Sequence, residues 1–342
     1  MMKTLSPVFS NIIFILALAL TACDGGDTGG NSDGTTYTAG KSVAYTVGSG
    51  TSAVSFNMHY APSGSFSSED DTVNKGTTSP PTTITVSHDY WIARTAVTYE
   101  LWMSVWNWAK DYSYNFTNFD PADYEPQYPV IFISWRDAVV WCNALTEYYN
   151  ATSKVSLVCV YTYNGDIVKD AYVDDTVIDW ANLTIATTAK GFRLPTSDEW
   201  ELAARYQNGT NWTPVDHVSG DTSGYCYDFG ISSTPSSVFG NYAWWGYEYD
   251  GGNCTSTKIV GTAGSLTPNT PCTGNANALG LYDMSGNVWQ WCINTYNAPS
   301  NLRVFRGGSW RDDRKWLALG WIGYGYSTDG YGFVGLRPVR TQ

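Results

Sequence analysis

The sequence predicts an α+β fold with few helices, short strands and much irregular structure. Three features of the 342-residue chain support this prediction. Few segments combine a helix start with an apolar face, the runs of alternating apolar residues are short, and most other stretches are rich in Gly, Ser, Thr, Asn and Tyr. There is no internal repeat and no second linker. We therefore expect a single core from about residue 43 to the end of the chain.

The first 22 residues have the pattern of a secretory signal peptide. They carry one charge, Lys3, and an apolar run over residues 12–20 that is too short to span a membrane. The run ends in Leu20-Thr21-Ala22-Cys23, which resembles a bacterial lipobox, where a diacylglyceryl group is attached to the cysteine thiol. The alternative is an ordinary cleaved signal in which Cys23 has no role.

A lipidated Cys23 would anchor the chain to a bacterial membrane on its extracytoplasmic side, and we expect the cell surface at the outer membrane. Residues 23–42 are predicted to form the lipidated end and a flexible tether, because residues 24–36 are rich in Gly, Asp, Ser and Thr. The folded domain is then expected to span residues 43–342.

Helices are predicted at three places. The helix expected over residues 98–109 has the weakest start signal. The other two begin at capping boxes, formed by Ser134 with Asp137 and by Thr196 with Glu199. Apolar stripes follow both boxes. Their members are Ala138, Trp141, Cys142, Leu145, Trp200, Ala203 and Ala204. Short strands are expected over residues 54–60 and 83–92, where apolar and polar residues alternate.

Composition excludes several classes of protein. Hydrophobic residues make up 43% of the chain, which excludes a disordered protein, and the charged fraction of 15% is too low for a long coiled coil. The net charge of −12 disfavours nucleic-acid binding, because an acidic surface repels phosphates. The 16 Trp and 25 Tyr exceed what a core requires, so some are expected to face outward in a recognition surface.

Six cysteines follow Cys23, and outside the cytoplasm an even number permits disulfides, with 15 pairings open. Their spacing contains no CxxC or Cys/His zinc pattern. Cys142 and Cys292 lie in apolar, aromatic stretches and are expected to be buried thiols. A bridge is expected first among the loop cysteines Cys226, Cys254 and Cys272.

Five motifs, in order along the chain, resemble one known family. They are Val97-Thr98, Pro129-Val130 with Ser134-Trp135-Arg136-Asp137-Ala138, Phe192–Thr196 with Glu199–Arg205, Ala278–Cys292, and Arg306-Gly307-Gly308-Ser309-Trp310 with the closing Gly335–Arg340. Together they resemble the formylglycine-generating enzyme (sulfatase-modifying factor) domain family. The resemblance implies a C-type-lectin-like fold across nearly the whole mature chain.

The resemblance also implies a calcium site at Asn287 and Gln290, since this loop ligates calcium in enzymatic relatives. Those relatives carry Glu where this chain has Gln290, and a neutral amide binds a hard cation more weakly. The alternative, which we favour, is a hydrogen-bonded turn at Gly286-Asn287 that returns Trp289 and Trp291 to the core. No other cofactor is expected.

The catalytic residues of enzymatic relatives are not found. The oxidase branch requires a pair of cysteines for copper in the last stretch, and this chain has no cysteine after Cys292. The iron-dependent branch requires a histidine cluster, and the histidines here, His59, His88 and His217, are scattered. The sequence contains no common nucleophile or nucleotide motif and no paired carboxylates for acid–base chemistry. We therefore expect a protein that is not an enzyme.

The C-terminal segment mixes Tyr, Trp, Ser, Gly and Asp as antibody paratopes do. The alternative is a pair of aromatic strands beside the core, but the segment shows no clear two-residue burial period. The candidate ligand-binding residues are Asp312, Asp313, Trp316, Trp321, Ile322, Tyr324, Tyr326, Ser327, Asp329 and Tyr331. We expect them on one exposed patch, whereas Trp310, Leu317 and Arg337 are expected to be structural.

This segment is also similar to the variable proteins of diversity-generating retroelements, including treponemal ones. These elements rewrite a C-terminal stretch at template adenines, so that Asn codons yield Tyr, Asp, Ser, Gly or Ile. Trp316 and Trp321 cannot arise from an Asn codon, so they need a different template or are fixed. The candidate variable region spans about residues 303–340.

The predicted function is that of a surface-anchored, non-catalytic binding lipoprotein. It is expected to be a monomer that binds a protein or glycan ligand, touches the membrane through its lipid and does not bind nucleic acid. The two alternatives are an oxidase or related modifying enzyme of the same family and a structural envelope lipoprotein.

Overall fold

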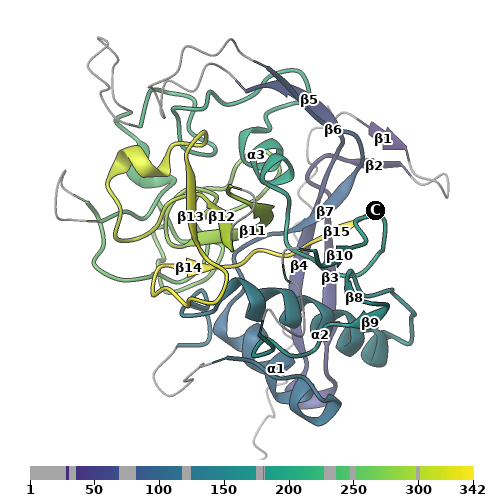
Figure 1. Ribbon diagram of the computed structural model, residues 1–342. Coiled ribbons are helices and arrows are strands. Elements are labelled where there is room, and N and C mark those ends of the chain that lie inside the picture. The colour runs from purple at the N-terminus through teal and green to yellow at the C-terminus, as the bar shows by residue number, and fades with distance from the viewer. Residues whose placement is uncertain are drawn as a thin grey trace, which may run out of the picture.

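The computed structural model describes most of the chain beyond the predicted signal peptide (Figure 1). The described residues are 28–30, 36–68, 82–117, 125–174, 180, 182–226, 236–246, 252–297 and 301–342. The predicted signal peptide, Cys23 and the first part of the tether lie outside them. No helix in the described ranges is both long and apolar enough to cross a membrane.

The three predicted helices are present where their start signals place them. They are α1 (Tyr99–Ala109), α2 (Trp135–Ser153) and α3 (Ser197–Arg205). Both predicted capping boxes form. The hydroxyls of Ser134 and Thr196 accept from the backbone N–H three residues later, and the carboxylates of Asp137 and Glu199 accept from the backbone N–H of Ser134 and Thr196 in return. Thr98 caps α1 by accepting from the backbone N–H of Leu101.

One four-stranded antiparallel sheet has the order β15 (Val339–Thr341), β7 (Tyr90–Ala93), β4 (Val54–Ala61), β3 (Ser42–Val47). Helices α1 and α2 lie against it (Figure 1). Because the last strand of the chain pairs with β7, the C-terminus closes the fold beside its N-terminal sheet.

The second four-stranded sheet carries the C-terminal segment. Its order is β13 (Ile322–Tyr326), β12 (Leu302–Arg306), β11 (Trp289–Thr295), β14 (Val334–Gly335), with β11 and β14 parallel and the other pairs antiparallel. Helix α3 packs on this sheet through a second cluster of buried residues. The two sheets lie on different sides of the molecule (Figure 1).

Short two- and three-stranded sheets complete the described chain. They are β1 (Thr28–Gly30) with β2 (Thr36–Thr38), β5 (Gly64–Ser67) with β6 (Thr83–Val86), and β10 (Thr184–Ile185) with β8 (Tyr161–Tyr163) and β9 (Asp166–Ile167). The single strand expected over residues 83–92 is therefore two strands, β6 and β7, in different sheets.

The end of the predicted tether is part of the fold. Thr36–Thr38 is a strand, the Tyr37 ring lies 5.1 Å from that of Trp91, and Gly40 donates to the Tyr60 carbonyl. The expectation of a free tether up to residue 42 is wrong for residues 36–42, because an aromatic residue there packs on the N-terminal sheet.

The bridge expected among Cys226, Cys254 and Cys272 is not formed. These three, with Cys142, Cys159 and Cys292, are free thiols, and all except Cys272 are buried. Cys142 and Cys292 are fully buried, as expected, and burial raises the pKa of both thiols far above its usual value. Their role is packing, because a thiol held protonated in the core is unreactive.

Candidate binding site

The outer strand β13 alternates glycine with larger residues. It pairs with β12 so that Tyr324 lies opposite Val304 and Gly323 opposite Phe305. Successive side chains of a strand point to opposite faces, so the larger residues share one face and the glycines the other. The expectation that this segment lacks a two-residue period is therefore wrong for Ile322–Tyr326.

The two glycines of β13 are required because aromatic rings pack directly against them. A Cβ atom at Gly323 would overlap the ring of Phe305, and one at Gly325 would overlap the ring of Tyr331. The glycine face of β13 is thus closed by aromatic rings. Any larger residue at either position would displace them.

Four partly exposed aromatic residues pack against the core cluster that contains Phe305, the ring over Gly323, and we call them the glycine-side group. They are Trp316, Trp321, Tyr331 and Phe333. The rings of the two tryptophans meet edge to face, with their centroids 4.2 Å apart. The Tyr331 hydroxyl accepts from the backbone N–H of Tyr326 and donates to Asp329. The group is therefore held in place by the core beneath it and by its own contacts.

Three tyrosines form a second set around the opposite face of β13, and we call them the outer group: Tyr296, Tyr324 and Tyr326. Tyr324 stacks on Tyr296 with their centroids 3.9 Å apart and their planes inclined by 19°. Their exposed fractions are 37% for Tyr296, 50% for Tyr324 and 52% for Tyr326. The predicted single patch is therefore divided, since β13 separates Tyr324 and Tyr326 from Tyr331.

The other predicted ligand-binding residues differ in accessibility. Asp313 is partly exposed and Asp329 exposed, while Ile322 packs partly buried against the α3 cluster. Asp312 accepts from the Trp289 indole N–H at 2.8 Å and from the Ser309 hydroxyl, and burial raises its pKa.

Ser327 is fully buried, and its backbone N–H donates to the Asn301 carbonyl. Its predicted contact with a ligand is therefore not supported, because the side chain lies beneath the surface. The three residues expected to be structural also differ: Leu317 and Arg337 are fully buried, but Trp310 is only half-buried.

Phe132 adds a residue that the sequence analysis missed. It is 48% exposed and has a φ of 58°, which is a strained conformation for a bulky residue. Its N–H donates to the Tyr331 carbonyl, and Gly330 and Gly332 approach it closely. It therefore joins the glycine-side group. Its sequence context gave no signal, since the apolar run Val130–Ile133 is typical of a core.

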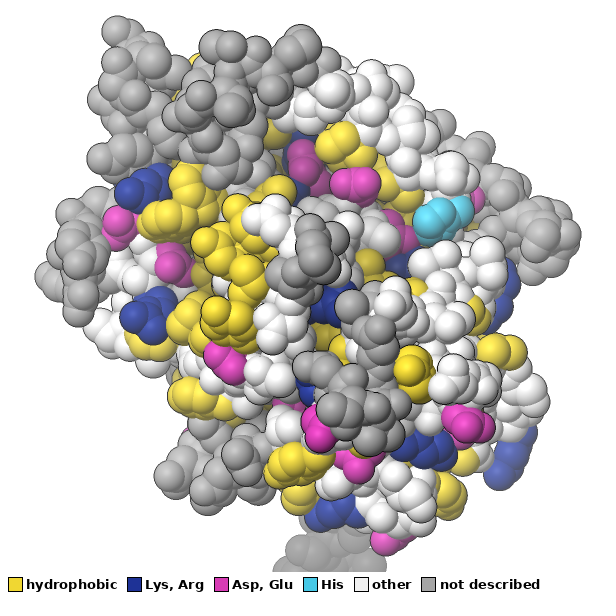
Figure 2. Space-filling model, in the orientation of Figure 1, with side chains coloured by type: hydrophobic (Ala, Val, Ile, Leu, Met, Phe, Trp, Pro, Cys, Tyr) yellow, Lys and Arg dark blue, Asp and Glu magenta, His cyan; other side chains and the backbone are white. Residues whose placement is uncertain are grey.

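Figure 2 shows hydrophobic side chains gathered in a continuous band over β12 and β13, with charged residues at its margin. A charged residue also lies beside the glycine-side group: the guanidinium of Arg311 is 4.8 Å from the centre of the Phe333 ring. Aromatic surface of this kind, held rigid and rimmed by charge, is typical of recognition sites.

Beneath this surface lies a fully buried network centred on Gln290. Its amide oxygen accepts from the Trp200 indole and from Arg337 Nε, each at 2.8 Å, and its amide nitrogen donates to the Asp283 carbonyl at 2.7 Å. The guanidinium of Arg337 also donates to the carbonyls of Ala93, Tyr282 and Asp283. These bonds join α3 and both four-stranded sheets. They therefore hold α3 and the two sheets in fixed positions relative to one another.

Residues 50–342 match the model of the sulfatase-modifying factor enzyme 1-like domain. The chain belongs to this family. The resemblance predicted from the five motifs is thereby confirmed, and so is the C-type-lectin-like fold of the formylglycine-generating-enzyme type.

Two relatives of this formylglycine-type domain illustrate the range of the family. The chain is 28% identical over 262 residues to chaperone protein LppX of Paenibacillus barcinonensis, covering 74% of this chain and 81% of that protein. It is 31% identical over 138 residues to the inactive C-alpha-formylglycine-generating enzyme 2 of Mus musculus, covering 40% and 37%. The second alignment thus spans less than half of either protein.

Among solved structures, the formylglycine-type domain resembles Treponema denticola variable protein 1 with a TM-score of 0.60 and 26% identity, covering 88% of this chain and 99% of that one. It also resembles CarF with a TM-score of 0.57 and 23% identity, covering 84% and 98%. The likeness to CarF concerns the fold alone. The likeness to a variable protein agrees with the similarity noted for the C-terminal segment.

The calcium that enzymatic members hold does not fit the geometry at Asn287 and Gln290. The Gln290 oxygen already accepts two hydrogen bonds, one from the cationic Arg337. The Asn287 oxygen accepts from the Lys258 backbone N–H at 3.0 Å, and its amide donates to Lys258 and Asp283. A divalent cation here would have to displace these bonds and face a buried guanidinium. Both residues instead form the hydrogen-bonded turn.

The histidines occupy three separate environments. His59 is buried and bonds the Leu279 carbonyl, His88 bonds Glu199, and His217 bonds the neighbouring Asp216. Within the described ranges, no group of three or more His, Cys, Asp or Glu side chains could hold a metal ion.

Proposed function

We propose that this protein is a non-catalytic ligand-binding lipoprotein displayed at the bacterial cell surface, whose binding site is formed by the two aromatic groups flanking β13. The observation that carries the proposal is the exposure of large aromatic side chains on β13, a strand whose backbone pairs with β12 and whose opposite face is packed. Tyr324 and Tyr326 are each about half exposed, although Gly323 and Gly325 of the same strand are packed under rings.

The energetics support a binding role for these residues. Rings that face water contribute little to folding, whereas rigid aromatic anchors supply most of the affinity of protein interfaces. Because the Tyr324 ring already stacks on Tyr296, little conformational entropy is lost when a ligand covers it. The partner proposed is a protein or glycan, and the binding unit is the monomer.

The decisive test replaces Tyr324 and Tyr326 together by Ser. We expect the melting temperature to change little, because both side chains are exposed and the described chain offers their hydroxyls no partner. We expect loss of every ligand that the unmodified chain captures from a glycan array and a peptide-display library, with each anchor contributing about 2 kcal/mol or more.

The matched control replaces Tyr172, which is 54% exposed and lies outside both aromatic groups, by Ser. Its ligand capture should match that of the unmodified chain. Retained capture by the Tyr324/Tyr326 variant would show that ligands bind elsewhere, and a collapse of its melting temperature would show that the tyrosines are structural.

The lipid anchor is proposed at Cys23, with a diacylglyceryl group attached to its thiol before cleavage behind Ala22. The lipobox-like sequence and the apolar run before it support this proposal. Replacing Cys23 by Ala should leave an unprocessed precursor that incorporates no labelled fatty acid. Normal incorporation of label into that variant would contradict the anchor.

Diversification of residues 303–340 is proposed from the similarity to a variable protein together with the composition of the segment. A near-copy of these codons, differing at adenines, is expected in the flanking DNA. If no such copy exists, the binding site is encoded as one fixed sequence.

A second candidate function is chaperone activity, because the relative LppX, aligned over 81% of its length, is named a chaperone protein. The exposed aromatic groups could hold an unfolded apolar chain. Suppression of aggregation of a denatured client, lost in the Tyr324/Tyr326 variant, would favour this function over specific ligand recognition. The oxidase alternative would require bound copper and aldehyde formation on a cysteine-containing sulfatase peptide.

A further inference from the structure

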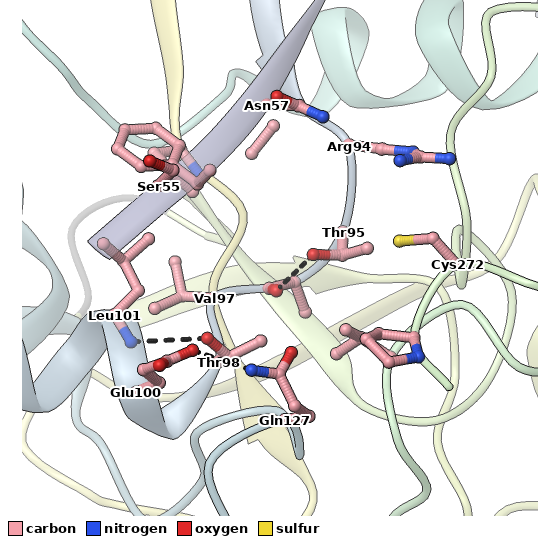
Figure 3. Close-up of a pocket in the computed structure, with 16 residues that line it drawn as sticks. Ser55, Asn57, Arg94, Thr95, Val97, Thr98, Glu100, Leu101, Gln127 and Cys272 are labelled. Atoms are coloured by element: carbon pink, nitrogen blue, oxygen red, sulfur yellow. Dashed lines mark hydrogen bonds between the residues drawn. The ribbon is translucent and has the colours of Figure 1, made fainter. Parts of the chain in front are cut away.

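A cavity of about 340 Å³ lies where the start of α1 meets β4, β7 and the loop that contains Cys272 (Figure 3). Its volume lies at the lower end of the range for small-molecule sites and corresponds to about ten water molecules. None of its lining residues belongs to either aromatic group. It is therefore independent of the proposed binding surface.

The cavity contains a cation that pairs with no carboxylate in the described part of the chain. Arg94 lines it, is half-buried, and donates from Nη2 to the Tyr282 hydroxyl at 3.1 Å, with its guanidinium 4.9 Å from the centre of that ring. Its Nε is buried and has no hydrogen-bond partner. Across the described chain, no carboxylate is within ion-pair distance of Arg94. A half-buried guanidinium with an unused donor is suited to bind an anionic group.

The far end of the cavity has the opposite charge. Glu100 accepts from the amide of Gln127 at 2.7 Å, and both side chains lie across the cavity from Arg94 (Figure 3). The walls between the two ends include the apolar side chains of Val97 and Leu101 and the hydroxyls of Ser55, Thr95 and Thr98, but no charged group. A ligand that fits this arrangement carries one negative group, an uncharged body and no second negative charge.

Cys272 adds a second irregular feature on the Arg94 side. It has a φ of 57°, a left-handed conformation that is unusual for this residue type, and its carbonyl accepts from the Tyr282 hydroxyl at 3.2 Å. Tyr282 thus contacts both Arg94 and Cys272. The thiol faces the cavity, so it can report on what occupies the space (Figure 3).

The geometry points to a second ligand site in this cavity, which binds a small organic monocarboxylate through Arg94, with Glu100 excluding dicarboxylates. The carboxylate bonds the free donors of Arg94, and the alkyl chain lies along Val97 and Leu101. A terminal ammonium group on the ligand is accepted at Glu100.

Calorimetric titration with butyrate, 4-aminobutyrate and succinate tests this site in the purified chain. Butyrate and 4-aminobutyrate should bind, and succinate should bind about tenfold more weakly or not at all. Arg94→Gln should weaken both monocarboxylates by about tenfold or more. Lys41→Gln, which removes an exposed cation elsewhere, should leave them unchanged. No binding of any probe, or equal binding by Arg94→Gln, would overturn the proposal.

Two further measurements keep the site testable if Arg94→Gln folds poorly. Glu100→Gln, an exposed substitution, should increase succinate affinity by relieving repulsion. Butyrate should also slow maleimide labelling of the Cys272 peptide, measured by mass spectrometry. Unchanged succinate affinity in Glu100→Gln together with unprotected Cys272 would refute the site.

Discussion

The network around Arg337 and the surface around β13 each combine aromatic side chains with an arginine, but they differ in exposure. The network contains Trp200 and Arg337, and the β13 surface contains its tyrosines and tryptophans with Arg311. In the network, Arg337, Gln290 and Trp200 are fully buried, and hydrogen bonds to three backbone carbonyls and one side-chain amide hold the guanidinium. Around β13, by contrast, Tyr324 and Tyr326 are half exposed, and no described residue bonds their hydroxyls.

The difference shows that composition does not decide which aromatic and basic residues become core. What decides it is whether the fold supplies a hydrogen-bond partner for each polar atom. Burying an unpaired polar atom costs more free energy than burial of the rest of its side chain gains. The network supplies these partners from three different elements. The β13 surface supplies rings and glycines but few acceptors, so its polar ends remain in water.

The largest effect is expected from Arg337→Gln. The substitution leaves the carbonyls of Ala93, Tyr282 and Asp283 without their donor and removes a charge that Asp283 faces across the turn. We expect the free energy of unfolding to fall by about 3–5 kcal/mol. Denaturant unfolding measures this loss. Arg311→Gln on the β13 surface is the matched control, and a loss of similar size there would remove the contrast between the two regions.

A smaller effect is expected when Glu199 is protonated. Burial opposes its charge, but hydrogen bonds from Arg193 and His88 lower the pKa of Glu199 to about 2. A carboxyl with a depressed pKa stabilises the fold fully above its unfolded value near 4.5 and loses that stabilisation as the pH falls toward 2. The contribution at neutral pH is about 3 kcal/mol.

The measurement compares the pH dependence of unfolding for the unmodified chain and for Glu199→Gln. The difference in stability between them should be constant above about pH 5 and should shrink between about pH 4.5 and 2. A difference independent of pH throughout this window would mean that the Arg193–Glu199 pair contributes nothing through its charge. No comparable acid step is expected from the aromatic surface.

The smallest effect on stability is expected from Phe132→Gly. Glycine adopts a φ of 58° without strain, and this relief offsets the packing that the half-exposed ring provides, so the net change should stay within about 1 kcal/mol. Ligand capture should nevertheless fall, since the ring lies against Gly332, next to Tyr331 of the glycine-side group. Thermal melting and array binding measure the two quantities. A large drop in stability with unchanged capture would place Phe132 in the core.

The helices could be predicted from sequence because their signals are local. The capping boxes at Ser134 and Thr196 each need only four residues to form, and both form as predicted. The family motifs likewise identified the fold, and the burial of Arg337 followed from its motif.

The division of the site into two groups could not be predicted, because it depends on contacts between distant segments. That Gly323 lies under Phe305 follows from the register of β13 on β12, which no local pattern encodes. That Phe132 reaches the site depends on its pairing with Tyr331, far along the chain. The apolar run around Phe132 instead favoured burial.

The packing of β13 has a consequence at the level of codons. An Asn codon in a template copy would place side chains as well as glycine at positions 323 and 325, where the rings of Phe305 and Tyr331 leave no space for them. A GGN codon in the template has no adenine outside its third position, so it would keep glycine there through every round of substitution. The packing of β13 therefore predicts GGN codons at Gly323 and Gly325 in any template copy, and adenine-containing codons at Tyr324 and Tyr326.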